Sequence, residues 1–352
     1  MEIKEIIATL AEGKDLSPKV AEDVMRLIMA GGVTEAQIAA FLTALKFKGE
    51  TVDELESFAK VMRESCVPVR PKVNGILVDT CGTGGDKIKT FNVSTLVALV
   101  VSGAGGYVAK HGNRSVTGRC GSADLMEGFG VNIQASPKIV EECIEELGIG
   151  FIFAPLFHPA MKNVAKVRKE MGIKTVFNVL GPLTNPAPVK AQLLGVYSAD
   201  LTEKLAEVLS RLGVERALVT HGLIGVDEIS IIGETRVTEL NQGAIATYHI
   251  KPSMFGLKEA SRIEELLGGD LEENIGHCIR ILNGAKDQKA DMAVLNSAAG
   301  IVACGRADNI QEGIDLARES IESGRALKKL TLLIKKTGGD MGRFEEAQRR
   351  HA

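Results

Sequence analysis

Apolar residues recur at helical spacing over the first 65 residues of the chain. The first apolar stripe consists of Ile3, Ile6, Ile7 and Leu10. Three later helix starts are marked by capping residues, namely Ser17 before Pro18, Thr34 with Gln37, and Thr51 with Glu54. These helices are expected to end at Gly31-Gly32 and at Gly49. We therefore predict a small all-helical N-terminal domain over residues 1–67.

The hydrophobic pattern changes after residue 71. Short apolar runs that are typical of buried strands occupy 75–79, 106–109, 150–153, 192–197, 217–220 and 229–232. Helical periodicity returns in a helix that begins near Asn92, and again at 137–147, 201–212 and 310–323. Strands that alternate with helices predict a central, mostly parallel sheet with crossover connections. We expect this larger α/β domain to span residues 72–345.

Composition excludes several classes of protein. The 352 residues are 45% hydrophobic and 25% charged, which is typical of a globular chain. Aromatic residues make up 4% and Trp is absent, so we expect no stacking surface for single-stranded nucleic acid. The net charge of −3 also lacks the basic excess of a nucleic-acid-binding protein. We therefore predict that nucleic acid is not a partner.

Signals for targeting and for structural zinc are weak. The first helix carries acids within its apolar stretch, unlike a secretory signal. The most apolar segment, 93–109, is too short to span a bilayer. The six cysteines form no C-x-x-C pair and no H-x-x-x-H occurs, so a zinc site has little support. We expect a cytoplasmic protein with reduced thiols and no membrane partner.

A glycine-rich segment, Asp79-Thr-Cys-Gly-Thr-Gly-Gly-Asp86, follows the first predicted strand. Glycines let the backbone approach a ligand and turn its amide groups toward an anion. The spacing fits neither the P-loop nor the dinucleotide-binding fingerprint. A tight turn between a strand and a helix also explains a lone glycine cluster, and for this segment alone the turn is favoured.

Two neighbouring segments shift the balance toward a phosphorylated ligand. Polar residues at 91–95 begin an apolar helix, where they either cap the helix or leave its amide groups to a phosphate. Segment 110–122 combines cations, hydroxyls and glycines, and no acid occurs before Asp124. Residues 87–123 contain five cations and no acid, a local charge of +5, so the rest of the chain carries −8. Such a local excess suits a phosphate or a pyrophosphate.

Two further sets of charged residues are less specific. Asp227 and Glu228 follow a predicted strand, where ligands bind in α/β sheets, and such hard oxygen donors suit Mg²⁺. Adjacent carboxylates more often lie in solvent. Arg168 has the chemistry to bind a substrate carboxylate, but from the residues alone an exposed helix face is favoured for it.

Taken in order, these segments resemble the anthranilate phosphoribosyltransferase family. The motifs are Cys-Gly-Thr-Gly-Gly-Asp at 81–86, Phe-Asn-Val-Ser-Thr at 91–95, Lys-His-Gly-Asn-Arg at 110–114, Gly-Ser-Ala-Asp at 121–124, Phe-Asn-Val-Leu-Gly-Pro-Leu-Thr-Asn-Pro at 177–186 and Asp-Glu at 227–228. The likeness extends from the first helices to about Lys336. It implies the fold of nucleoside phosphorylases and phosphoribosyltransferases, with helices from about 160–186 joining the N-terminal domain.

The resemblance also implies an activity in tryptophan biosynthesis. The phosphoribosyl group of 5-phosphoribosyl 1-pyrophosphate (PRPP) would pass to the amine of anthranilate, giving N-(5-phosphoribosyl)anthranilate and pyrophosphate. Mg²⁺, as two ions per subunit, would be required. An aromatic amine is neutral and nucleophilic at pH 7, so no residue is assigned as acid or base, and positioning is expected to supply most of the catalysis.

The resemblance assigns residues to each ligand. Those for PRPP are Gly82, Gly85, Asp86, Thr90, Asn92, Val93, Ser94, Thr95, Lys110, His111, Gly112, Asn113, Arg114, Ser115, Val116, Thr117, Gly118 and Ser122. Those for anthranilate are Gly82, His111, Asn113, His158 and Arg168. Those for Mg²⁺ are Ser94, Asp227 and Glu228. Positioning of the substrates falls to Lys110, Asn113 and Arg168.

Two departures from the family pattern and two alternatives stay open. Thr117-Gly118 stands where the family often has two serines, and 223–226 is more apolar than the version common in the family.

A nucleoside phosphorylase of the same fold is one alternative, although it is expected to carry a different phosphate signature. A relative that has lost catalysis and binds nucleic acid would lose Asp227-Glu228 or gain a basic excess. The family further implies a homodimer formed through the helical domain.

Overall fold

The computed structural model describes residues 2–85, 87–115 and 120–351. Its N-terminal part is a set of four helices: α1 (Ile3–Ala11), α2 (Pro18–Met29), α3 (Glu35–Lys48) and α4 (Val52–Glu64). The capping boxes predicted at Thr34 and Thr51 are confirmed, since each hydroxyl accepts a hydrogen bond from the amide three residues later. Ser17 occupies the N-cap position of α2, but its side chain accepts no capping hydrogen bond.

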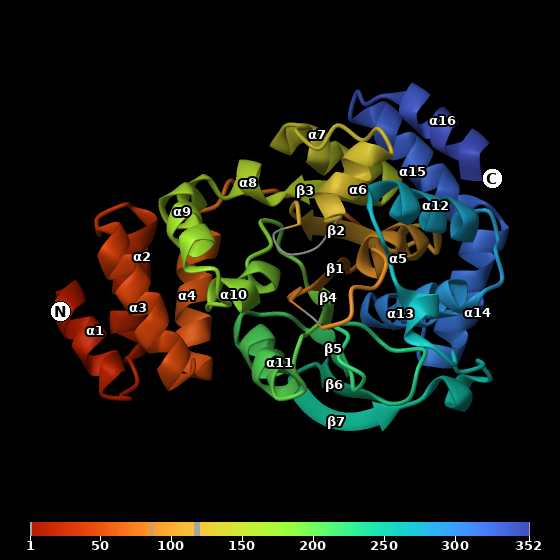
Figure 1. Cartoon of the computed structure of the whole chain (residues 1–352). Helices are drawn as coiled ribbons and strands as arrows, with labels where there is room; N and C mark the ends of the chain where they lie inside the picture. Colours follow the sequence, from red (N-terminus) through yellow and green to blue (C-terminus); the bar gives the residue numbers. More distant parts are fainter. Residues whose placement is uncertain (1, 86, 116–119, 352) are drawn as a thin grey trace.

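A seven-stranded sheet forms the centre of the larger part (Figure 1). Its strands are β1 (Leu77–Gly82), β2 (Tyr107–Gly112), β3 (Ile149–Phe153), β4 (Ala191–Gly195), β5 (Arg216–Gly222), β6 (Thr235–Asn241) and β7 (Ala244–Ile250). The order is β3-β2-β1-β4-β5-β6-β7, in which β1 to β5 are parallel and the last two pairings are antiparallel. The predicted fold class, a helical domain with an α/β domain around a mostly parallel sheet, is confirmed.

The strand predicted at 229–232 is wrong. This run is largely buried but irregular, because side chains take the place of a neighbouring strand: the amide of Ile232 donates to the hydroxyl of Ser230, and the amide of Ile229 donates to the distant Asn296. The sequence analysis also missed the β6–β7 hairpin. Its turn is made by Gln242 and Gly243, which both adopt positive φ, as a tight hairpin turn requires.

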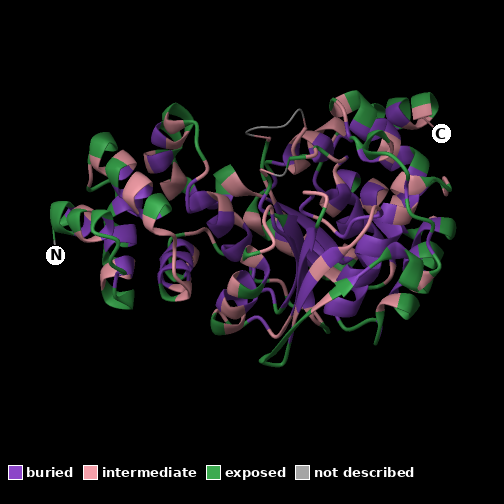
Figure 2. Ribbon diagram, turned by 60° about the horizontal axis from the view of Figure 1, so that its bottom comes forward, coloured by how far each residue is buried: buried purple, intermediate pink, exposed green. Residues whose placement is uncertain are grey.

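Helices cover both faces of the sheet. One face packs against α5 (Val93–Gly103) and α13 (Gln288–Ala303), and the other packs against α11 (Leu201–Arg211). Adjacent strand residues therefore enter different cores, with Leu193 facing the α5 side and Leu194 facing the α11 side. In Figure 2 the strands form the buried centre of this part, and the residues of α5 are almost all buried.

The remaining helices lie around these layers. They are α6 (Ser122–Gly128), α7 (Pro137–Glu142), η1 (Cys143–Leu147), α8 (Ala154–Phe157), η2 (Pro159–Met161), α9 (Lys162–Met171), α10 (Phe177–Leu183), η3 (Pro252–Phe255), η4 (Ile263–Leu266), α12 (Leu271–Leu282), α14 (Ile310–Glu322), α15 (Arg325–Lys336) and α16 (Met341–His351). The helix predicted at 137–147 is present but changes to a π-helical turn at Cys143. Among the described helices, none combines the length and apolar character needed to cross a membrane.

The segment that contains α9 and α10 packs against the N-terminal helices (Figure 1). Val164, Val167 and Phe177 belong to the same apolar core as the buried faces of α2, α3 and α4. The side-chain amide of Asn163 donates to the carbonyl of Met29 at 2.7 Å. This hydrogen bond holds the C-terminal end of α2 against α9. Because the loops on either side of this segment reach the sheet, side chains of α9 and α10 are brought to the edge where β1 to β5 end.

Candidate active site

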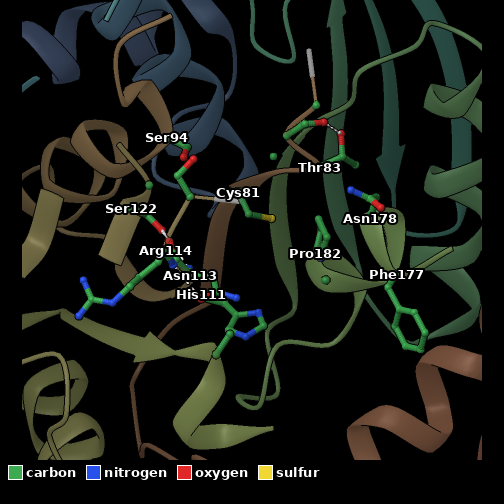
Figure 3. A pocket seen from close by; sticks show the side chains of 18 of the residues that line it. Cys81, Thr83, Ser94, His111, Asn113, Arg114, Ser122, Phe177, Asn178 and Pro182 are labelled. Atoms are coloured by element: carbon green, nitrogen blue, oxygen red, sulfur yellow. Dashed lines mark hydrogen bonds between the residues drawn. The ribbon is translucent and has the colours of Figure 1, made fainter. Parts of the chain in front are cut away.

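A cavity of about 600 Å³ lies at the carboxyl ends of the parallel strands, and we call it the central cavity. One wall is built from the loops that follow β1, β2, β3 and β5 together with the start of α5 (Figure 3). The opposite wall comes from α9 and α10. The predicted ligand residues that line it are Gly82, Gly85, Thr90, Asn92, Val93, Ser94, Lys110, His111, Gly112, Asn113, Arg114, Ser115, Ser122, His158, Arg168, Asp227 and Glu228.

The remaining predicted ligand residues fall into two groups. Thr95 is fully buried in α5 and is not a lining residue, and its hydroxyl has no hydrogen-bond partner among the described residues. Asp86, Val116, Thr117 and Gly118 lie outside the described residues. The departure noted at Thr117-Gly118 therefore falls on residues that the structure does not describe.

The central cavity opens where the strand order reverses. The chain runs from β1 outward through β2 to β3, and returns to place β4 on the other side of β1. Gly82 ends β1 opposite Gly195, which ends β4. A Cβ atom on Gly82 would lie 2.6 Å from Oδ2 of Asp227, and one on Gly195 would lie 1.4 Å from the Asp227 carbonyl oxygen. Both glycines are needed so that the loop with Asp227 can close over this crevice, the usual ligand site of such sheets.

The glycine-rich segment is both a tight turn and part of the cavity wall. The amide of Thr83 donates to the Gly195 carbonyl at 2.9 Å, and the amide of Gly84 donates to Oδ2 of Asp227 at 2.9 Å. Gly84 and Gly85 adopt φ of 62° and 77°, which is a conformation that favours glycine. The turn hypothesis and the ligand hypothesis thus describe the same structure.

The start of α5 faces the central cavity without a side-chain cap. Asn92 occupies the N-cap position, but its side chain accepts no hydrogen bond from the first turn. Its Nδ2 instead donates to the carbonyl of Cys120, and its amide donates to Oδ1 of Asn274 at 2.9 Å. The helix-cap interpretation of Asn92 is therefore wrong. The first-turn amides and the positive end of the helix dipole suit an anionic ligand.

Lys110 brings a positive charge to the floor of the central cavity. Its ammonium group is buried and donates to the Thr80 carbonyl and, at 3.3 Å, to Oγ of Ser94. Burial lowers the pKa of Lys110, and the negative charge of Asp79 opposes that shift. Asp79 itself is fully buried and accepts from Asn185 Nδ2 at 2.8 Å, while burial raises its pKa. Asn185 of the 177–186 motif thus supports the strands beneath the cavity.

Arg114 is already paired within the protein. Its guanidinium group donates to Asp124 at 2.9 Å and to Glu127 at 2.8 Å, and in Figure 3 it extends away from the other labelled side chains. The local positive charge counted along the sequence is therefore partly offset by acids of α6. Asn113 and Ser122 are bonded to each other, because Ser122 Oγ accepts from the Asn113 amide at 3.2 Å.

Arg168 enters the central cavity from α9. It is half-buried, and the centre of its guanidinium group lies 5.3 Å from the centroid of the Phe177 ring. Burial lowers its pKa. Within the described part of the chain, no carboxylate or carbonyl accepts a hydrogen bond from this guanidinium group. The exposed-face interpretation is wrong, and a cation in this state favours an anionic ligand.

Two neutral histidines that line the central cavity lie next to each other. The rings of His111 and His158 are 5.2 Å apart between centroids. Burial lowers the pKa of His111 well below its usual value, and lowers the pKa of His158 to about 4. The Nε2 atom of each ring is buried and has no hydrogen-bond partner among the described residues. Two acceptors of this kind suit a ligand that donates hydrogen bonds.

Comparison with known proteins decides the family. Residues 74–327 match the glycosyl transferase family, a/b domain, and residues 4–66 match the glycosyl transferase family, helical bundle domain. The anthranilate phosphoribosyltransferase of Persephonella marina is 51% identical over 332 residues, which cover 94% of this chain and 98% of that protein. The corresponding enzyme of Methanocorpusculum labreanum is 52% identical over 338 residues, which cover 96% and 98%. The chain belongs to the anthranilate phosphoribosyltransferase family.

Solved structures of the anthranilate phosphoribosyltransferase family have the same fold. The crystal structure of the Thermus thermophilus enzyme superimposes with a TM-score of 0.89 at 45% identity, covering 95% of this chain and 99% of that one. The Saccharomyces cerevisiae enzyme in complex with PRPP and Mg gives a TM-score of 0.87 at 30% identity, covering 96% and 98%. The resemblance stated from the motifs is confirmed, and the chain is a glycosyltransferase of the phosphoribosyl-transferring kind.

The oxygen donors predicted for Mg²⁺ lie together at the crevice between β1 and β4. Glu228 Oε2 accepts from the hydroxyl of Thr90 at 3.1 Å, and Asp227 Oδ2 accepts from the Gly84 amide. Among the described residues, no group of three or more His, Cys, Asp or Glu side chains is placed to hold a metal ion. Two carboxylates with one hydroxyl fit Mg²⁺ in this family, because Mg²⁺ binds through few protein groups and through substrate phosphates.

Some residues that shape the site were missed by the sequence analysis. Gly195 ends a strand that was predicted, but nothing in its surroundings along the chain shows that a distant loop covers it. Asn274 holds the Asn92 amide from α12, 182 residues further along the chain. Lys174 donates to the carbonyl of Gly85 from the loop between α9 and α10. No local sequence signal identifies such contacts, since each joins segments that only the fold brings together.

Proposed function

We propose that the central cavity catalyses the transfer of the phosphoribosyl group of PRPP to the amine of anthranilate, with release of pyrophosphate. The observation that supports this function best is that two anion-binding sets of groups from different parts of the fold line one cavity. The donor end has Lys110, the glycine loop and the start of α5, and the acceptor end has the half-buried Arg168 of α9. Such a cavity suits one ligand with phosphates and a second ligand with a carboxylate. A nucleoside phosphorylase has less support, since Arg168 suits an anion better than a nucleobase and the relatives named above are anthranilate phosphoribosyltransferases.

The donor end would bind PRPP through backbone amides and a few polar side chains. The residues proposed are Gly82, Gly85, Asp86, Thr90, Asn92, Val93, Ser94, Lys110, Ser122 and the segment 111–118, whereas Thr95 is left out because it does not line the cavity. The S. cerevisiae relative solved with PRPP and Mg supports this assignment. As pyrophosphate leaves, negative charge grows on its oxygens, and Lys110 together with the loop amides would stabilise that charge without rearrangement.

The acceptor end would orient anthranilate for attack. Arg168 would hold its carboxylate, and Asn113 and Gly82 would contact the ring or amine. The neutral Nε2 atoms of His111 and His158 would accept hydrogen bonds from the amine. The S. cerevisiae relative in complex with 4-fluoroanthranilate supports a site for this class of aromatic acid. The main contribution of these residues is orientation, because the amine is already nucleophilic.

Three further features are proposed with this function. Asp227, Glu228 and Ser94 would hold two Mg²⁺ ions per subunit, which when bound neutralise the pyrophosphate. A homodimer would form through the helical domain, where α1 and α3 enclose a groove that includes the exposed Phe47. A cytoplasmic location is supported by six cysteines that are all unpaired.

The direct test follows the intrinsic fluorescence of anthranilate after PRPP and Mg²⁺ are added. Wild-type protein is expected to abolish the signal only when both are present. Arg168→Ala is expected to raise the KM for anthranilate at least tenfold and the KM for PRPP far less, because it removes one charged contact from the acceptor end. Lys169→Ala, an exposed cation on the same helix, is the matched control. No loss of fluorescence with wild-type protein, or equal rises in both KM values, would contradict the proposal.

A further inference from the structure

Lys174 connects the segment that contains α9 and α10 with the glycine-rich segment. It lies in the short loop between α9 and α10, the segment that also presents Arg168 to the acceptor end. Its ammonium group donates to the carbonyl oxygen of Gly85 in the glycine-rich segment. The same ammonium group lies 3.9 Å from the centroid of the Tyr197 ring, within the range of a cation–π contact. Lys174 is not a lining residue, so these contacts lie outside the ligand space.

Tyr197, whose ring contacts Lys174, is also hydrogen-bonded to the glycine-rich segment. Tyr197 follows β4, and its amide donates to the hydroxyl of Thr83 at 3.1 Å. The approach of Lys174 is close, since a Cβ atom on Gly85 would lie 2.7 Å from its Cε. On the opposite flank, Asp227 accepts from the Gly84 amide. The segment is therefore held by a carboxylate on the sheet side and by an ammonium group on the side of α9 and α10.

The orientation of the Gly85 carbonyl matters for an anionic ligand. Gly85 adopts positive φ, and the backbone of a glycine reaches other conformations with little steric cost. Rotation about the Cα–C bond of Gly85 would turn its carbonyl oxygen, which is partly negative, toward the central cavity. A phosphate bound there would be repelled by that oxygen, whereas amide groups attract it. A fixed hydrogen-bond donor behind the loop prevents this rotation.

We propose that Lys174 is a positioning residue for the donor end: it holds the Gly85 carbonyl out of the central cavity, so that the glycine loop stays ready to bind the pyrophosphate of PRPP. This inference rests on the function proposed above. It also means that the segment with α9 and α10 serves both substrates, with Arg168 at the acceptor end and Lys174 behind the donor loop.

The test compares Lys174→Met with Lys174→Arg. Met keeps most of the length of the side chain and can pack its sulfur against the Tyr197 ring, but it has neither the donor nor the charge. The KM for PRPP is therefore expected to rise about tenfold while the KM for anthranilate changes less than twofold. Arg is expected to restore most of the PRPP affinity, because a guanidinium group donates hydrogen bonds and stacks on aromatic rings. Lys169→Met is the control for loss of a positive charge on the same segment.

Calorimetric titration with PRPP and Mg²⁺ separates this inference from the proposed function. If wild-type protein binds PRPP but does not consume anthranilate, the proposed function fails, and the Lys174 variants still test the inference through their dissociation constants. Equal PRPP affinity in wild type and Lys174→Met overturns the inference. Equal rises in both KM values with a lower melting temperature also overturn it, since they indicate a structural role only. Failure of wild-type protein to bind PRPP overturns both.

Discussion

Replacing Gly195 with Ala tests how the loop over the crevice forms the site. Its added Cβ atom would lie 1.4 Å from the carbonyl oxygen of Asp227, and such contacts are essentially never shorter than 3.0 Å. The backbone at Asp227 must therefore move by about 1.6 Å, and both carboxylates of 227–228 move with it. Displacement of reacting or positioning groups by about 1 Å costs roughly 100-fold in rate. We expect kcat/KM for PRPP to fall at least 100-fold.

The effect on stability is expected to be similar in free energy to the effect on activity, since a 100-fold loss of rate corresponds to about 2.7 kcal/mol. Overpacking a buried site by one methyl group costs about 1–3 kcal/mol, and both Gly195 and Asp227 are buried. Activity would be measured by the loss of anthranilate fluorescence across a Mg²⁺ titration, and stability by urea unfolding. Gly342→Ala is the matched control, since its Cβ atom would meet only the flexible side chain of Asp340 at 3.1 Å. Activity within threefold of wild type and an unchanged Mg²⁺ titration would refute the reasoning.

Three further predictions concern charge. Replacing Asp227 with Asn and Glu228 with Gln is expected to move the midpoint of the Mg²⁺ titration at least tenfold higher, because the oxygen donors lose their charge. Replacing His158 with Gln is expected to reduce the loss of stability as pH falls from 6.5 to about 4, because this histidine alone contributes up to about 3 kcal/mol to that loss as the unfolded chain takes up the proton. Replacing the buried Glu54 with Gln is expected to cost about 2 kcal/mol in urea unfolding, because Lys48 loses one of its two carboxylate partners, at 2.8 Å, and keeps Asp15 at 2.7 Å.

Each of these predictions has a result that contradicts it. An unchanged Mg²⁺ midpoint in the double variant removes both carboxylates from the metal site. Parallel stability curves for wild type and His158→Gln between pH 4 and 7 mean that His158 is protonated normally in the folded state. Asp23→Asn, which breaks the exposed pair with Lys19, is the control for Glu54 and is expected to cost less than about 0.5 kcal/mol. Equal costs for the two substitutions would refute the role of burial.

Local signals predicted the helices and the parallel strands well. The capping boxes at Thr34 and Thr51 depend on atoms three residues apart, so the sequence contains all the information that they need. The strand prediction at 229–232 is wrong because part of the information that decides the structure there lies far away in the sequence. The apolar residues of this run are largely buried, as in a strand, but Ser230 and the distant Asn296 satisfy its backbone in an irregular form. Apolar content alone does not distinguish a strand from a buried loop.

Charge counting along the chain gave an incomplete picture of the site. The stretch with a local charge of +5 does contain Lys110, which lines the central cavity. Arg114 of the same stretch is paired with Asp124 and Glu127, acids that lie just beyond the stretch that was counted. Arg168, which the residues alone placed on an exposed face, is half-buried in the cavity wall. Its environment depends on Phe177 and on the packing of α9 against the N-terminal helices.

The sequence by itself determined the helical N-terminal domain, the alternation of helices with parallel strands, the family and the residue types available for phosphate and carboxylate binding. Those features depend on short-range periodicity and on motifs whose members are close along the chain. Only the tertiary structure decided which groups share one cavity, which cavity cation lacks an acceptor among the described residues, and which glycines must lack a side chain. Gly195 and Asp227, or Gly85 and Lys174, are far apart along the chain, and their contacts exist because parallel strands end at one edge of the sheet and α9 and α10 pack across it.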